Sequence, residues 1–237
     1  MPYHPFADSS PVRLRLTRAA PTKVNVGLRV LRMRPDGYHD LETVLVPVGW
    51  SDQLEAAPAA RLRLTCSDPA LPTDDGNLVV KAAHRLAAWA GSELGADLHL
   101  EKRAPYGAGL GSGSSDAAAA LLLLVDVWGL SSVPEADLQA LAAGLGSDVP
   151  FFLYGCPALA TGRGEELSAL KGRDGSPWKC PFWLVVAVPP VHVSTAEAYR
   201  LVVPDGRSRP DLAAAIVSDD LGRWRREVTN DFEGPLV

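Results

Sequence analysis

A glycine-rich segment between residues 105 and 118 carries the strongest chemical signature in this chain. Its sequence is PYGAGLGSGSSDAA, in which glycine alternates with other residues from Gly107 to Gly113. Glycines at this density let successive backbone N–H groups face one way and come close to a ligand. The apolar run that begins at Ala117 predicts a helix, whose N-terminus adds a positive dipole end and unpaired N–H donors. The segment therefore predicts a site for a polyphosphate anion and favours a nucleotide-using enzyme.

An isolated glycine-rich segment is most often a flexible loop, so its neighbours decide between the two interpretations. An alternating segment at 97–102 predicts a strand before the loop, and the apolar run at 117–127 predicts a buried helix after it. Strand, loop and helix in this order favour a phosphate loop. It is not a Walker loop, because no Gly-Lys-Ser/Thr sequence closes it. No frame matches the GxGxxG of dinucleotide-binding folds or the GxSxG of a nucleophile elbow.

Two other segments carry candidate reactive side chains. Lys23 and Asn25 are alternate residues of a strand predicted at 22–31, so their side chains share one face. A solvated strand face and an active-site pair both fit this pattern. Asp148 lies between a Gly-Ser turn and an apolar segment, where an aspartate is either a turn former or helix cap, or a partly buried base.

Four further polar positions have ordinary structural explanations. Tyr38 and His39 follow an Asp-Gly turn, where such a pair most often serves packing and the surface. Asn77 precedes a helix predicted at 78–90 and suits a helix cap. Asp116 suits an N-terminal helix charge that stabilises the helix dipole.

The remaining patterns predict a mixture of strands and helices. Further strands are expected at 12–16, 41–48, 62–65 and 182–188. The last of these is apolar throughout and is stopped by Pro189. Further helices are expected at 195–201, 210–217 and 134–143, the last begun by a Ser132 cap. Hairpin-like stretches, in place of regular βαβ alternation, indicate an α+β fold.

Composition and charge exclude several function classes. The 237 residues suffice for one large domain or two small ones with ample core. A formal net charge of −5, without a long basic run, argues against a nucleic-acid surface. Three cysteines without CxxC spacing and five histidines without HExxH argue against a disulfide framework and a zinc site. Free thiols, no signal peptide and no membrane-length apolar run predict a soluble, cytoplasmic protein.

Four segments, in order along the chain, resemble the GHMP small-molecule kinases. Ala20-Pro-Thr-Lys-Val-Asn25 is similar to the family's P-A-K-I-N. Arg34-Pro-Asp-Gly-Tyr-His-Asp-Leu41 is similar to its R-x-D-G-Y-H-x-L, and the glycine-rich segment to its P-x-G-x-G-L-G-G-G-S-S. Leu145-Gly-Ser-Asp-Val-Pro-Phe151 is similar to L-G-A-D-V-P-F/V. Fainter similarity continues at 162–164, 190–195 and 230–233.

The resemblance implies a two-domain, α+β GHMP kinase-like fold. The N-terminal, ATP-binding domain with the glycine-rich phosphate loop is expected at 1–160. A smaller α/β C-terminal domain is expected at 161–237. Because the family continues beyond the segment matched at 230–233 with a second glycine-rich segment, the C-terminal domain is expected to be incomplete relative to the family.

The resemblance also implies a catalytic pair and an ATP site. Lys23 would stabilise charge on the transferring phosphoryl group or lower the pKa of the acceptor hydroxyl. Asp148, kept ionised by Lys23, would take the proton from that hydroxyl. The N–H groups of residues 109–115 would bind the β-phosphate region, and Asn77 would face adenine. The full expected ATP set is Asn77, Pro105, Gly107, Gly109, Leu110, Gly111, Ser112, Gly113, Ser114 and Ser115, with Ser115 also reaching Mg²⁺.

The implied acceptor is a small molecule with an alcohol group, phosphorylated by ATP with Mg²⁺. The Asp-Gly-Tyr-His segment resembles members that hold cytosine, so the expected acceptor is a cytidine diphosphate methylerythritol of the non-mevalonate route to isoprenoid precursors. Its expected contacts are Asn25, Tyr38, His39, Thr195 and Tyr199. No nucleic-acid or membrane partner is expected, and the protein is expected to be a monomer or a homodimer. Two alternatives stay open: a sibling kinase for mevalonate-, homoserine- or sugar-type substrates, and a catalytically impaired nucleotide-binding module.

Overall fold

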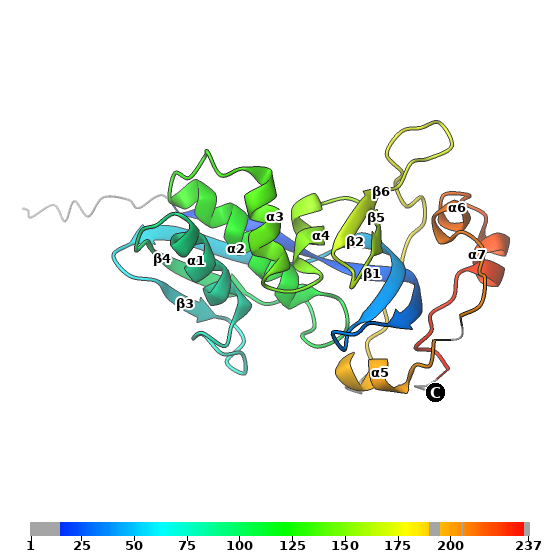
Figure 1. The fold of residues 1–237 in the computed structure, drawn as a ribbon. Coiled ribbons are helices and arrows are strands. Elements are labelled where there is room, and N and C mark those ends of the chain that lie inside the picture. Colours follow the sequence, from blue (N-terminus) through cyan, green and yellow to red (C-terminus); the bar gives the residue numbers. More distant parts are fainter. Residues whose placement is uncertain (1–14, 190–194, 205, 235–237) are drawn as a thin grey trace, which may run out of the picture.

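A six-stranded sheet runs through the molecule, and helices α1–α4 lie together on one side of it (Figure 1). The computed structural model describes residues 15–189, 195–204 and 206–234, with only the backbone of residues 195–197. Neighbouring strands are hydrogen-bonded in the order β3-β4-β2-β5-β6, and β1 pairs with β2. This arrangement confirms the expected α+β class.

The first two strands form one long antiparallel hairpin. β1 spans Leu16–Met33 and β2 spans His39–Ala59. In the turn between them Gly37 has φ +83°, a conformation that favours glycine, and its N–H donates to the Arg34 carbonyl at 3.1 Å. The strands expected at 22–31 and 41–48 are confirmed but longer, and three register shifts interrupt the regular pairing of β1 with β2. The strand expected at 12–16 falls mainly outside the described residues.

The glycine-rich loop is framed by elements that the sequence predicts. β3 (Arg63–Cys66) lies parallel to β4 (Gly95–Glu101), and helix α1 (Leu78–Trp89) connects them. β4 is antiparallel to β2 on its other side. Helix α2 (Ser112–Val127) packs against α1 and the sheet, and its alanines and leucines fill the main hydrophobic core. The loop therefore connects a central strand to a buried helix.

The second half of the chain extends the same sheet. β5 (Ala158–Thr161) pairs with β2, and β6 (Glu166–Ala169) pairs with β5. Helix α3 (Glu135–Ala143) is confirmed, but its N-cap is the extended residue Pro134, which makes no side-chain cap bond, and not Ser132 as expected. Helix α4 (Val149–Tyr154) packs against α2. Since β5 crosses the expected domain boundary after residue 160, the division into two domains stays a prediction.

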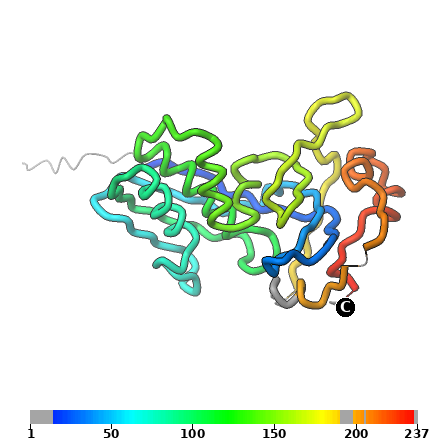
Figure 2. Tube along the Cα trace, in the orientation of Figure 1, coloured from blue at the N-terminus to red at the C-terminus, as the bar shows by residue number. Residues whose placement is uncertain are grey.

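Three short helices lie in the C-terminal part of the described chain. They are α5 (Thr195–Leu201), α6 (Leu212–Ile216) and α7 (Leu221–Glu227), of which the first two were expected. After α7 the chain returns to the hairpin end of β1 (Figure 2), where Leu28 donates its N–H to the Thr229 carbonyl at 2.9 Å. Among the helices of the described chain, none combines the length and apolar character that a membrane span requires.

The strand expected at 182–188 is wrong. This segment belongs to no strand, and the side chains of Trp183 and Val185 are 100% and 97% exposed. A run that is apolar on both faces forms a strand when a sheet and covering layers bury both faces. Within the described residues no strand pairs with this segment, so its apolar pattern does not lead to sheet structure.

Candidate active site

The glycine-rich loop uses its glycines for a left-handed backbone path. Gly107, Gly109 and Gly111 have φ values of +72°, +73° and +68°. A Cβ at Gly109 would meet no atom within 4 Å, so the backbone at this point faces open space. A Cβ at Gly111 would lie 3.0 Å from Phe152 Cζ and 3.1 Å from Lys23 Cε, so glycine also permits close packing against α4 and β1.

Helix α2 begins inside the loop, at Ser112, and not at Ala117 as expected. Ser112, Gly113 and Ser114 therefore form its first turn, where N–H groups have no intrahelical acceptor and are available to an anion. The N–H of Ser115 is already bonded to the Gly111 carbonyl at 2.9 Å. The expected donor range of 109–115 thus narrows to residues before Ser115.

The middle of the loop is attached to β1. The N–H of Lys23 donates to the carbonyl of Leu110 at 2.9 Å. Across the loop, the Ser112 hydroxyl donates to the carbonyl of Pro105 at 3.3 Å. These bonds hold the loop beside the side chain of Lys23.

Lys23, Asn25 and Asp148 meet at this point. Lys23 Nζ lies 3.2 Å from Asp148 Oδ2 and donates to Asn25 Oδ1 at 2.7 Å. The Lys23 side chain is only 7% exposed and that of Asp148 is 33% exposed, so the lysine is fixed while the carboxylate stays accessible. Asn25 is held in turn by Thr43, whose hydroxyl accepts from Asn25 Nδ2 at 3.0 Å.

The position of Asp148 argues against a purely structural role. It occupies the N-cap position of α4, but its side chain makes no cap hydrogen bond. Its backbone is in the right-handed helical region, at φ −83° and ψ −15°. An acceptor group that is neither capping its helix nor fully buried, beside a lysine, suits proton transfer.

An aromatic cluster lies around the other expected substrate residues. The rings of His39 and Tyr199 stack with centroids 5.3 Å apart, and Phe232 meets Tyr199 edge-on at 5.0 Å. Burial raises the pKa of the Tyr199 hydroxyl to about 12, with a smaller contribution from the negative charge of Asp148. One face of Tyr199 is thus covered by His39. Phe232 was not predicted as part of this cluster.

Tyr38 stands at the exposed edge of this region. Its side chain is 55% exposed, and the guanidinium of Arg163 lies 5.0 Å from its ring centroid. Arg163 comes from the turn between β5 and β6, which is fixed to β2 by a 2.8 Å bond from the Leu41 N–H to the Gly162 carbonyl. Sequence reasoning missed Arg163, although the Gly-x-Gly pattern marks its turn. The side chain of Thr195 lies outside the described residues.

Two other expected ATP residues have clear local environments. Asn77 caps α1, since its Oδ1 accepts from the Val79 N–H at 2.9 Å while its Nδ2 donates to the Pro72 carbonyl at 2.7 Å. Its contact with adenine stays a prediction. Ser115 Oγ is buried and has no hydrogen-bond partner in the described structure.

The protein oxygen atoms at the start of α2 could hold a metal ion only together with a phosphate ligand. Among the described residues no group of three or more His, Cys, Asp or Glu side chains could hold an ion. The unpartnered hydroxyl of Ser115 is nonetheless a hard oxygen of the type that Mg²⁺ prefers. Because Mg²⁺ is commonly bound through few protein oxygens together with substrate phosphates, Ser115 fits that use.

Asp116, expected as an N-terminal helix charge that stabilises the helix dipole, is buried in an ion pair. It is 3% exposed, and its Oδ2 accepts from Lys102 Nζ at 2.8 Å. Burial raises the pKa of Asp116 to about 7, although the charge of Lys102 opposes the shift. Burial alone would lower the pKa of Lys102, but the carboxylates of Asp116 and Asp52 outweigh it and raise that pKa.

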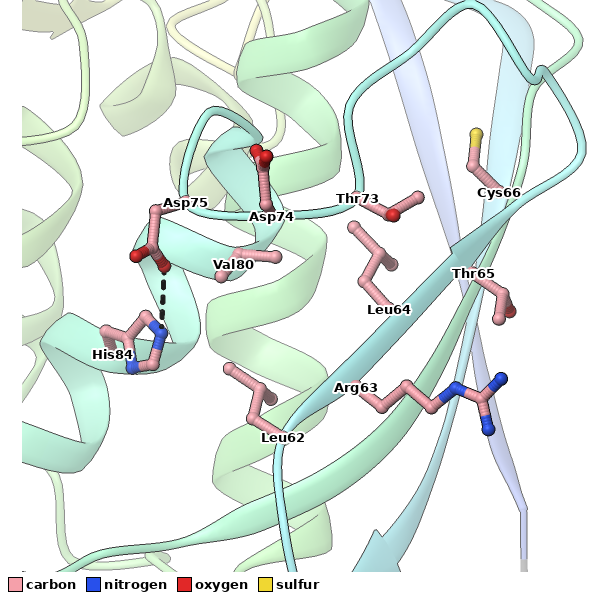
Figure 3. Close-up of a pocket in the computed structure, with 10 residues that line it drawn as sticks. All are labelled: Leu62, Arg63, Leu64, Thr65, Cys66, Thr73, Asp74, Asp75, Val80 and His84. Carbon is pink, nitrogen blue, oxygen red and sulfur yellow. Dashed lines mark ion pairs between the residues drawn. The ribbon is translucent and has the colours of Figure 1, made fainter.

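A cavity of about 670 Å³ lies elsewhere, between β3, the segment 73–75 and α1 (Figure 3). On its wall His84 Nε2 lies 3.2 Å from Asp75 Oδ1. The residues that line it are Leu62, Arg63, Leu64, Thr65, Cys66, Thr73, Asp74, Asp75, Val80 and His84. None of the expected site residues is among them, so the site rests on the loop and its neighbours.

Comparisons with known proteins agree on one group of enzymes. Residues 77–156 match the family described as GHMP kinases N terminal domain. The chain is 54% identical to the 4-diphosphocytidyl-2-C-methyl-D-erythritol kinase of Salinibacter ruber, over 94% of this chain and 78% of that protein. It is 44% identical to the enzyme of the same name from Chloroherpeton thalassium, over 89% of this chain and 73% of the relative.

Solved structures show the same likeness. A crystal structure of 4-(cytidine 5'-diphospho)-2C-methyl-D-erythritol kinase superposes with a TM-score of 0.70 at 38% identity, over 93% of this chain and 77% of that one. Homoserine kinase from Cytophaga hutchinsonii superposes with a TM-score of 0.59 at 18% identity, over 97% of this chain and 74% of that one. The second likeness concerns the fold alone.

Proposed function

This chain belongs to the 4-diphosphocytidyl-2-C-methyl-D-erythritol kinase family of GHMP kinases, and from this premise we propose how it performs that reaction. It is an ATP-dependent small-molecule kinase. It transfers the γ-phosphoryl group of ATP to a hydroxyl of 4-diphosphocytidyl-2-C-methyl-D-erythritol, in the non-mevalonate route to isoprenoid precursors. The observation that supports the assignment of roles best is the Lys23–Asp148 pair, held beside the glycine-rich loop by the Lys23–Leu110 backbone bond.

The proposed chemistry uses few reactive side chains. The acceptor oxygen forms a bond to the γ-phosphorus, the bond from that phosphorus to the β–γ bridging oxygen breaks, and ADP leaves. The proton of the acceptor hydroxyl passes to the Asp148 carboxylate and then to solvent. The Lys23 ammonium stabilises negative charge on the transferring group, while Asn25 holds the ammonium in place. Positioning and electrostatics carry most of such a transfer.

ATP binds in this proposal along the loop and the first turn of α2. The N–H groups of residues 109–114 face the phosphates, at the dipole end of a helix that is 16 residues long. When bound, Mg²⁺ would neutralise negative charge on the phosphates of ATP, and Ser115 is the residue that would hold it. The three cysteines, Cys66, Cys156 and Cys180, are free thiols, which supports a reducing cytoplasm as the compartment.

The acceptor's cytosine is assigned to the surface formed by Tyr38, His39 and Tyr199. We expect cytidine monophosphate to compete with the acceptor but not with ATP. His39→Ala should raise the KM for the acceptor about tenfold, as expected from losing roughly 1 kcal/mol of aromatic stacking together with a hydrogen-bonding group. The KM for ATP should stay within about twofold, since the ring contact of His39 is the stack on Tyr199, on the acceptor side of the site.

A matched control separates this effect from a general loss of a histidine. His84→Ala removes a histidine from α1 that is 61% exposed and lies on the cavity of Figure 3. It should leave both KM values unchanged. Absence of inhibition by cytidine monophosphate in the wild-type protein would favour a sibling kinase and contradict the cytosine assignment.

A further inference from the structure

Lys102 joins the two ends of the glycine-rich loop through a buried ion-pair cluster. Its Nζ donates to Asp52 Oδ2 at 2.5 Å and to Asp116 Oδ2 at 2.8 Å. Lys102 lies just before the loop, whereas Asp116 lies in α2 just after the last glycine of the loop, and Asp52 belongs to β2. All three side chains are at most 5% exposed.

Asp52 also fixes the start of the loop directly. Its Oδ1 accepts from the N–H groups of Arg103 and Ala104, at 2.6 and 2.8 Å, immediately before Pro105. Trp50 adds a bond from Nε1 to the Arg103 carbonyl at 2.9 Å. The start of the loop is therefore attached to β2, and Lys102 extends this attachment to α2.

Stability alone does not explain this cluster, because burying its charges costs desolvation free energy. It places two carboxylates and one ammonium in the interior, and Asp116 Oδ1 has no hydrogen-bond partner in the described structure. Buried ion pairs of this kind commonly stabilise no more than apolar side chains of similar volume. The ion pairs hold the start of the loop at a fixed distance from α2. Without them, the glycine-rich chain between these two segments would leave that distance variable.

We propose that Lys102 is a positioning residue that sets the shape of the glycine-rich loop for the phosphates of ATP. The proposal rests on the proposed function, since it assumes that ATP binds at this loop. Lys102 acts through Asp52 and Asp116. Fixing both ends before ATP arrives lowers the conformational entropy that binding must remove.

The test needs a variant that removes the link and leaves only one buried charge, the Asp52 carboxylate, without a charged partner. Lys102→Met combined with Asp116→Leu replaces one ion pair with apolar groups of similar volume, while Asp52 keeps its two backbone donors. The matched control is Arg18→Met with Asp126→Leu. That pair, at 3.2 Å, also joins the sheet to α2, but at the end of the helix remote from the loop.

Calorimetric titration with a non-hydrolysable ATP analogue and steady-state kinetics give the result. The double variant should bind the analogue about tenfold more weakly and raise the KM for ATP by a similar factor, with the acceptor KM within about twofold. The control should match the wild type in all three quantities. The single variant Asp116→Asn keeps an oxygen that accepts from Lys102 Nζ, so its affinity for the ATP analogue should stay within about threefold of the wild type.

Two outcomes overturn the proposal. Wild-type affinity in a folded double variant would show that the link does not shape the site. An equal rise of both KM values would show a general structural role. If the double variant does not fold, Asp116→Ala takes its place in the test, because it leaves the Lys102–Asp52 ion pair, whose charges cancel. Asp116→Ala should then bind the ATP analogue more weakly than Asp116→Asn does, and equal affinities would overturn the proposal. A wild-type protein that binds no ATP analogue would instead refute the proposed function.

Discussion

Asp148→Asn should lower kcat by about 10²–10⁴-fold, the range expected for the loss of a general base. Asparagine keeps the size of the side chain and an oxygen for Lys23, which lies 3.2 Å away, but it cannot take a proton. Because Asp148 makes no cap hydrogen bond in α4, the thermal midpoint should change little. The KM for ATP should also stay close to that of the wild type.

Steady-state kinetics with both substrates, together with a thermal unfolding scan, check this result. Asp97→Asn is a suitable control, since it makes the same substitution in β4, away from the catalytic pair. A kcat within tenfold of the wild type, in a fully folded Asp148→Asn protein, would be incompatible with the role of a base. In that case Asp148 only orients the hydroxyl.

Lys23→Met should lower kcat by about 10²–10³-fold, as expected when one charged donor to a developing negative charge is lost. Methionine fills the volume of the buried lysine stem, and the remaining carboxylate of Asp148 is 33% exposed and can be solvated. Asn25 Oδ1 loses its donor, so the free energy of unfolding should fall by about 1–3 kcal/mol. Single-turnover kinetics, compared with urea unfolding of the same protein, separate the two effects.

The double variant Lys23→Met with Asp148→Asn tests whether the two residues act as one unit. Groups that share one transition state lose activity non-additively, so the double variant should be only slightly slower than the slower single variant. A loss equal to the product of the two single losses would mean that the residues act independently. That result would contradict the proposed pair.

Local signals predicted much of the architecture. Gly37 marked the hairpin turn, and Gly107, Gly109 and Gly111 marked the loop, because their left-handed backbone conformations favour glycine. The start of α2 was missed, since serine and glycine are weaker helix formers than the alanines and leucines that follow. The bond from the Ser112 hydroxyl to the Pro105 carbonyl, which attaches the first turn to the loop, is not visible in the sequence pattern. The strand predicted at 182–188 was wrong, because an apolar run forms a strand only where a neighbouring strand pairs with it, and the run itself does not show whether one does.

Long-range contacts were beyond the sequence patterns. Nothing in the spacing of Lys23 and Asp148 places them 3.2 Å apart, because their meeting depends on β1, the glycine-rich loop and α4 packing together. Only the resemblance to GHMP kinases suggested the pair. Asp116 was predicted only as a charge that stabilises the helix dipole, because its partner, Lys102, is brought to it by the path of the loop.

A turnover assay with the cytidine substrate tests the central claim most directly. Purified protein is incubated with ATP, Mg²⁺ and 4-diphosphocytidyl-2-C-methyl-D-erythritol, and in parallel with mevalonate or homoserine, while ADP release and the phosphorylated product are followed. The account predicts turnover with the cytidine substrate, none above background with the other two, and loss of turnover in Asp148→Asn. Preferred turnover of mevalonate or homoserine would contradict the substrate assignment, and binding of ATP without turnover of any acceptor would contradict the assignment as a kinase.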